Sequence, residues 1–132
     1  MLFRSPTAPG IWIANTLGEL GLFYRLAGHA FIGRSLVPLG GQNPIEPARL
    51  GCAIAVGPHI FNFPEAVEVL HTAGALTRVA DAAALTGWVA DMLTNPARAA
   101  AMGAAGQAAV RGLENLPTRI AGLLTELAHA RP

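Results

Sequence analysis

The stretch from residue 33 to 47, GRSLVPLGGQNPIEP, carries residue types that could hold a nucleotide. Gly40 and Gly41 have no side chains, so their backbone amides could approach a phosphate closely. A helix that begins next to Asn43 would add free N–H groups and the positive end of a helix dipole. Glu46 could accept hydrogen bonds from two neighbouring hydroxyls, as a carboxylate does when it holds a ribose. Together these residues have the chemistry of a nucleotide site.

The same residues also fit an interpretation without a ligand. Asn43 and Glu46 have the spacing of a capping box, and Gly40-Gly41 has the composition of a turn. The stretch has no Gly-Lys-Ser/Thr sequence, and its glycine spacing differs from G-x-G-x-x-G, so it matches neither standard phosphate-binding motif. The residues of this stretch therefore leave both interpretations open.

A second segment, residues 57–63 with the sequence GPHIFNF, contributes two further candidates, His59 and Asn62. His59 could transfer a proton, contact a phosphate or simply pack in the loop. It has no acidic or cysteine partner at metal-ligand spacing, so no metal site is expected. Ser35 lacks the sequence context of a nucleophilic serine, and Cys52 lies inside an apolar run typical of a buried strand.

Short apolar runs alternate with helical patterns along the chain, which predicts an α/β fold with a parallel sheet. The runs predict strands at 11–14, 30–33, 53–56 and 75–79, with 53–56 at the centre because it is apolar throughout. In such sheets ligands bind beyond the carboxyl ends of the strands. Segments 33–47 and 57–63 follow two of these strands, so they are expected at the same edge.

Caps and apolar periodicity predict the other helices. Thr16 and Glu19 have the spacing of a capping box for a helix that runs to about residue 26, with Tyr24 on its apolar face. Pro64 occupies a first helical position, and Asp81 is expected to cap the next helix. Two further helices are expected after residues 95–96 and after Gly112 and Pro117. Residues 82–132 are thus expected to be helical, and residues 1–10 to form a loosely ordered start.

Length and composition favour one domain over residues 1–132 and exclude several classes of function. All nine basic residues are arginines and the formal net charge is +1, so no basic patch for nucleic acid is evident. No apolar run reaches the length of a membrane span of about 20 residues, and residues 1–6 are not followed by the apolar segment of a secretory signal. A single cysteine excludes an internal disulfide framework and fits the cytoplasm.

Four motifs in the same order and spacing resemble the C-terminal part of the bacterial 3-deoxy-D-manno-octulosonic acid (Kdo) transferases. They are residues 15–27, NTLGELGLFYRLA; 31–38, FIGRSLVP; 40–47, GGQNPIEP; and 57–63, GPHIFNF. The resemblance implies the Rossmann-like C-terminal domain of a two-domain GT-B glycosyltransferase, with a partial doubly wound parallel sheet. It also implies transfer of Kdo from its cytidine monophosphate donor, CMP-Kdo, to lipid A precursor in lipopolysaccharide biosynthesis, at the cytoplasmic face of the inner membrane. No cofactor is implied.

The resemblance also assigns expected roles by position. Asn43 and Glu46 would contact the donor nucleotide, and Gly40, Gly41 and Ser35 would line its phosphate. The chain departs from the family at two positions. Arg34 stands where the family usually has glycine, so its side chain is expected either to contact the phosphate or to block the pocket. Gln42 stands where the family usually has histidine, and it is a possible site residue that cannot carry a proton as histidine can.

The family's N-terminal half, with its acceptor surface and general base, has no counterpart in these 132 residues. The resemblance therefore predicts a donor-binding part that is inactive alone, with no catalytic residue of its own, and that associates with an N-terminal half or with itself. Two alternatives remain open. One is a non-catalytic remnant or partner module of the same fold, and the other is a GT-B transferase that uses a different nucleotide sugar.

Overall fold

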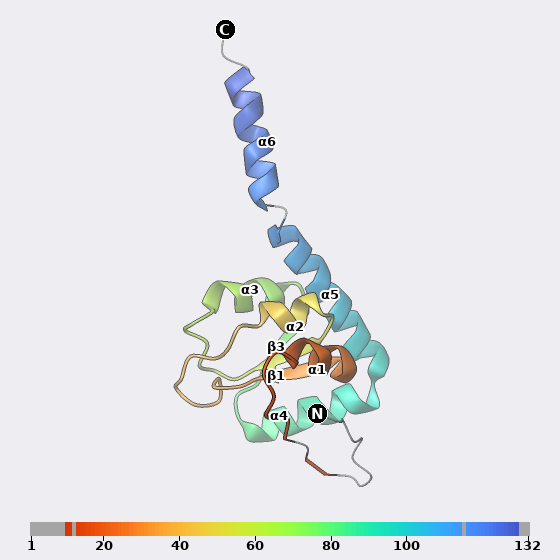
Figure 1. Cartoon of the computed structure of the whole chain (residues 1–132). Helices are drawn as coiled ribbons and strands as arrows, with labels where there is room; N and C mark the ends of the chain where they lie inside the picture. The colour runs from red at the N-terminus through yellow and green to blue at the C-terminus, as the bar shows by residue number, and fades with distance from the viewer. Residues whose placement is uncertain (1–9, 12, 115, 130–132) are drawn as a thin grey trace.

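The computed structural model describes residues 10–11, 13–114 and 116–129 (Figure 1). Three strands, β1 (His29–Ile32), β2 (Ala53–Val56) and β3 (Leu76–Arg78), form a parallel sheet in the order β1-β2-β3. The predicted strand 53–56 is confirmed as the central strand, because it alone pairs with two neighbours. The strands predicted at 30–33 and 75–79 are present with slightly different ends.

The described residues also form six helices. They are α1 (Leu20–Ala27), α2 (Ile45–Arg49), α3 (Pro64–Thr72), α4 (Ala82–Thr94), α5 (Pro96–Glu114) and α6 (Leu116–His129). Pro64 begins α3 as predicted, and the Asp81 carboxylate caps α4 by accepting a hydrogen bond from the Ala84 amide at 2.8 Å. Helices α5 and α6 confirm the helical C-terminal part, and α6 extends away from the sheet (Figure 1).

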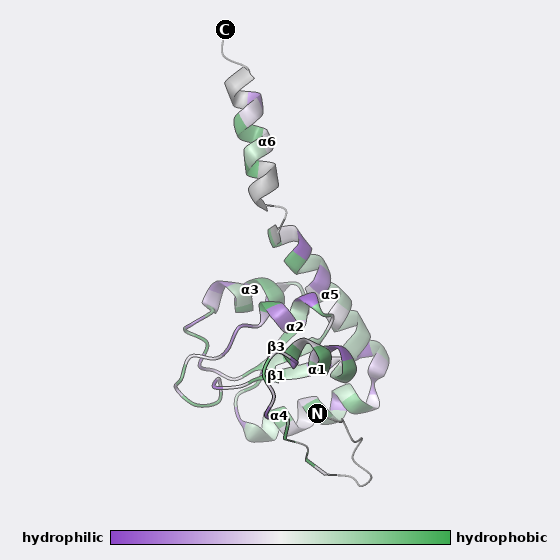
Figure 2. Ribbon diagram, in the orientation of Figure 1, coloured by the Kyte–Doolittle hydropathy of each residue, from purple (hydrophilic) through white to green (hydrophobic). Residues whose placement is uncertain are grey.

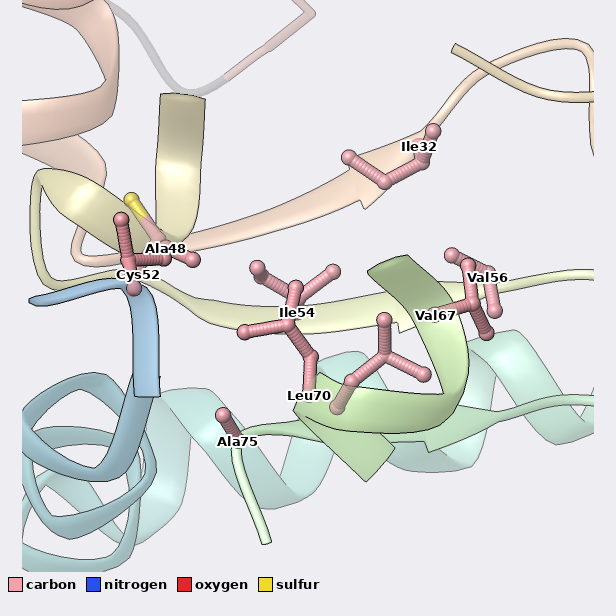
Figure 3. Packing of buried hydrophobic residues seen from close by; sticks show 10 residues of the cluster. Ile32, Ala48, Cys52, Ile54, Val56, Val67, Leu70 and Ala75 are labelled. Carbon is pink, nitrogen blue, oxygen red and sulfur yellow. The ribbon is translucent and has the colours of Figure 1, made fainter. Parts of the chain in front are cut away.

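The core lies on both faces of β2, because successive side chains of a strand point to opposite sides. Ile54 and Val56 pack on one face with Val67 and Leu70 of α3 (Figure 3). Ala53 and Ala55 pack on the other face in a cluster that includes Trp88 and Met92 of α4. Burial on both faces explains why this strand has no polar residue, as expected for a parallel sheet.

The predicted strand at 11–14 is wrong. Residues 11, 13 and 14 have no regular secondary structure, Trp12 lies outside the described residues, and Ile11 and Ile13 are 98% and 81% exposed. A β-branched apolar run becomes a strand only when another strand supplies its hydrogen bonds. No described strand pairs with this run.

The predicted capping box of the first helix is also wrong. Helix α1 begins at Leu20 with Glu19 as its N-cap, and no side chain caps it. Gly18 between the two predicted partners has a left-handed backbone, φ +82°, which interrupts the helix before it can include residues 16–18.

The structure shows no helix among its described residues that is long and apolar enough to cross a membrane. Residues 1–9 of the predicted loose start lie outside the described residues.

Candidate functional site

A pocket of about 240 Å³ lies between α1, the end of β1 and the start of α2. It brings together three of the residues that the sequence singled out, Gln42, Asn43 and Glu46. Its full lining is Leu20, Tyr24, Phe31, Ile32, Gly33, Gln42, Asn43 and Glu46. The pocket therefore lies at the carboxyl edge of the sheet, where ligands bind in open α/β folds.

The two loops that follow β1 and β2 lie at this same edge, as the sequence predicted. The His59 amide donates to the Ser35 carbonyl at 2.9 Å, and the Asn62 amide donates to the Gly40 carbonyl at 3.1 Å. The Asn62 side-chain amide also donates to the carbonyls of Leu39 and Gly41, at 3.3 Å each. Through these hydrogen bonds, His59 and Asn62 connect the loop that follows β2 to the loop that follows β1.

Gly40 and Gly41 have left-handed backbones, φ +87° and +74°, and are buried under the second loop. A Cβ atom on Gly40 would lie 2.5 Å from the Asn62 side-chain nitrogen, so a side chain here would require the Asn62 side chain to move. The Gly41 amide already donates to the Arg34 carbonyl at 3.1 Å. In this structure both glycines serve the contact between the loops, and neither lines the pocket.

Ser35 lies elsewhere than the sequence predicted. It was expected beside a phosphate, but it is fully buried. Its hydroxyl donates to the Ile32 carbonyl and accepts from the Gly57 amide at 2.8 Å. Because both hydrogen-bonding roles are filled inside the protein, Ser35 joins the ends of β1 and β2 and does not offer its hydroxyl to a ligand.

The structure tests the capping box that the sequence offered at Asn43 and Glu46. The Asn43 side chain accepts from the Ile45 amide, two residues on, at 2.9 Å, and no side chain caps α2. The Glu46 carboxylate is exposed in the first turn of α2 and forms no hydrogen bond or ion pair with any residue that the structure describes. The reciprocal capping box is therefore absent, and Glu46 is available to a ligand.

Tyr24 of α1 is a pocket residue that the sequence did not identify, because it had been placed only on the apolar face of a helix. Burial raises the pKa of its phenol above 10.0, and the negative charge of Glu46 raises this pKa further. Tyr24 and Glu46 both line this pocket. The signal that could have found Tyr24 was its position inside the first of the four motifs.

The remaining candidates lie near the pocket or form no site. Arg34 is exposed and follows the pocket residue Gly33, with a left-handed backbone of φ +62°. A larger hollow of about 380 Å³ lies at the opposite edge of the sheet, but its lining is mostly apolar and includes only one titratable side chain, His29. Within the described ranges, no group of three or more His, Cys, Asp or Glu residues could hold a metal ion.

A parallel sheet with helices on both faces and a pocket beyond its carboxyl edge defines a Rossmann-like α/β domain. The sequence matches no protein-family profile. It is 41% identical over 98 residues to the 3-deoxy-D-manno-octulosonic acid transferase of Bordetella pertussis, which covers 74% of this chain and 23% of that protein. It is 40% identical over 80 residues to the same-named protein of Haemophilus influenzae, covering 53% of this chain and 19% of that protein.

Comparison with solved structures identifies the same family. The chain superposes with a TM-score of 0.68 and 32% identity on the C-terminal CMP-Kdo binding domain of WaaA from Acinetobacter baumannii, covering 74% of this chain and 51% of that one. By sequence and by fold, this chain is homologous to the C-terminal part of the Kdo transferases, and its fold is that of a GT-B C-terminal domain. It spans about a quarter of the length of the Bordetella relative.

Proposed function

We propose that this chain is the donor-binding part of a Kdo transferase and that its pocket holds the nucleotide of CMP-Kdo. The observation that carries the proposal is the Glu46 carboxylate, which lies in the pocket at the carboxyl edge of the sheet without a partner among the described residues. A carboxylate there can accept hydrogen bonds from both ribose hydroxyls. The similarity to a domain described as CMP-Kdo binding supports cytidine as the base.

In this proposal each site residue has a defined role. Glu46 holds the ribose, while Asn43 and Gln42 contact the nucleotide from the same segment. Ser35, Gly40 and Gly41 act as positioning residues, because they hold the two loops together at the edge of the pocket. His59 and Asn62 belong to the same loop contact, through their backbone and side-chain amides.

The complete reaction, transfer of Kdo from CMP-Kdo to lipid A precursor at the cytoplasmic face of the inner membrane, requires more than this pocket. Catalysis needs the acceptor and a general base held in line with the donor. The matched region covers only 23% and 19% of the two bacterial relatives, so they have residues available for both tasks. We therefore assign donor binding to this chain and assign acceptor binding and proton abstraction to residues outside it.

Calorimetric titration of the chain with cytidine monophosphate (CMP) tests the donor assignment. We expect CMP to bind with a dissociation constant of about a millimolar or below, and more tightly than uridine or guanosine monophosphate. Tighter binding of another nucleotide would instead support a GT-B transferase with a different donor. No binding of any of the three at about millimolar concentration would support a non-catalytic module of the same fold.

We also propose that the edge of the sheet at β1 associates with another polypeptide, either an N-terminal half or a second copy. Strand β1 has no second strand neighbour among the described residues, and the nearby α1 buries none of its residues. Leu22 and Leu26, one turn apart on α1, are 44% and 73% exposed, and Figure 2 shows hydrophobic green next to hydrophilic purple on this helix. An open strand edge beside exposed apolar residues favours association.

Sedimentation velocity over a range of protein concentrations tests this association. In the absence of an N-terminal half, we expect the average mass to rise with concentration, and we expect Leu26→Glu to reduce the increase. Val69→Glu provides the matched control, because Val69 is 37% exposed on α3, and this helix contacts β3, the strand at the opposite edge of the sheet from β1. A monomer at all concentrations, or an equal effect of both substitutions, would contradict self-association through α1.

A further inference from the structure

The negative charge of the pocket is expected to repel the phosphate of the nucleotide that it is proposed to bind. Glu46 is the one charged residue in the described lining, and it is negative. A nucleotide phosphate is also negative, and like charges at close range repel strongly where little water screens them. A cation near the pocket would offset this repulsion, because phosphates are commonly bound by arginine or lysine.

Arg34 is placed to supply that cation. It follows the pocket residue Gly33 at the carboxyl end of β1, and its side chain is exposed. Its backbone is held in place because its carbonyl accepts the Gly41 amide at 3.1 Å. No ion pair joins it to a described acidic residue, whereas Arg78 and Arg98 pair with Glu68 and Asp91.

The backbone at Arg34 is in a conformation that is unfavourable for arginine. Its φ of +62° lies in the left-handed region, and no other non-glycine residue among those described has a positive φ. Glycine or asparagine adopts this conformation with less strain than arginine does. Strained backbone conformations of this kind concentrate at ligand sites. There, a contact between the side chain and the ligand can offset the strain.

We propose that the Arg34 guanidinium binds the phosphate of the nucleotide, so that recognition is divided between Arg34 on the phosphate and Glu46 on the ribose. This inference rests on the proposed function, because it assumes a nucleotide in the pocket. Arginine suits the task because its planar group donates two parallel hydrogen bonds to phosphate oxygens.

The test compares CMP with cytidine, which lacks the phosphate, by calorimetry on the wild-type chain and on Arg34→Asn. Asparagine tolerates the left-handed backbone, so this substitution removes the charge without adding strain. We expect the wild type to bind CMP more tightly than cytidine, and Arg34→Asn to weaken CMP binding by about 10- to 100-fold while leaving cytidine binding unchanged. Arg34→Lys should keep part of the preference for CMP, because it keeps the charge.

Arg111→Asn provides the control for net charge, because Arg111 is exposed on α5 and does not line the pocket. We expect it to leave the ratio of the two affinities unchanged. If the wild type binds CMP and Arg34→Asn binds it equally well, the Arg34 contact is overturned and the proposed donor site stands. If the wild type binds neither CMP nor cytidine, both proposals are overturned.

Discussion

Replacing Gly57 by alanine is expected to lower the free energy of unfolding by about 3 kcal/mol, the upper end of the usual effect of overpacking. A Cβ atom at this position would lie 2.3 Å from the Ser35 carbonyl oxygen and 2.7 Å from the Leu36 amide nitrogen. Both are backbone atoms, so relief requires the loop after β1 to move. Urea unfolding followed by circular dichroism measures the loss.

The same movement should weaken CMP binding, because this loop carries the Gly33 wall of the pocket. Gly33→Ala is the matched control for stability alone, because Gly33 itself lines the pocket. A Cβ atom at Gly33 would meet no atom within 4 Å beyond the two adjoining residues, and the backbone there has no positive φ. Alanine at this position should therefore change stability by less than about 1 kcal/mol. If Gly57→Ala proves as stable as the wild type, the close contact between the two loops does not hold the edge of the sheet together.

Replacing Glu46 by alanine is expected to weaken CMP binding by about 1.5 to 3 kcal/mol, the usual contribution of hydrogen bonds to a charged group. Stability should hardly change, because no hydrogen bond or ion pair links the carboxylate to the described part of the chain. The substitution should also lower the pKa of Tyr24, which the charge of Glu46 raises. This pKa should remain above 10.0, since burial is its larger cause.

The titration of Tyr24 can be followed by ultraviolet absorbance without interference from other phenols, because it is the only tyrosine. Since its pKa is raised in the folded state, its contribution to stability is complete below pH 10 and is lost as pH rises further. Glu65→Ala is the control, because Glu65 occupies the equivalent first turn of α3 and does not line the pocket that holds Glu46. Equal CMP affinity in Glu46→Ala and the wild type would show that Glu46 does not hold the ribose.

Local signals predicted much of this fold correctly. Asp81 caps α4 through an amide only three residues away, and Pro64 begins α3 by its own fixed backbone angle. The continuous apolar run at Ala53–Val56 indicated a strand buried on both faces, and this strand is the centre of the sheet. Each of these signals acts within a few residues, so a sequence contains it in full.

The errors arose where a distant or unexpected partner decides the structure. The apolar run at 11–14 lacks a neighbouring strand among the described elements. The capping-box error has a local cause instead, because the left-handed Gly18 separates Thr16 from Glu19, the residue that directly precedes α1. A distant partner also decides the position of Ser35, which had been predicted beside a phosphate. Ser35 is 22 residues from the Gly57 amide that occupies its hydroxyl, so no local pattern showed that it is buried.

The sequence by itself determined the α/β class, the central strand, the helical C-terminal part and the segment that carries Asn43 and Glu46. Only the tertiary structure decided which of the candidate residues face the pocket. It placed Tyr24 beside Glu46, left the Glu46 carboxylate without a described partner, and buried Ser35 between two strands. The physical reason is that a polar side chain's role depends on which hydrogen-bonding partners lie within about 3 Å. Packing between elements far apart in the sequence brings those partners together.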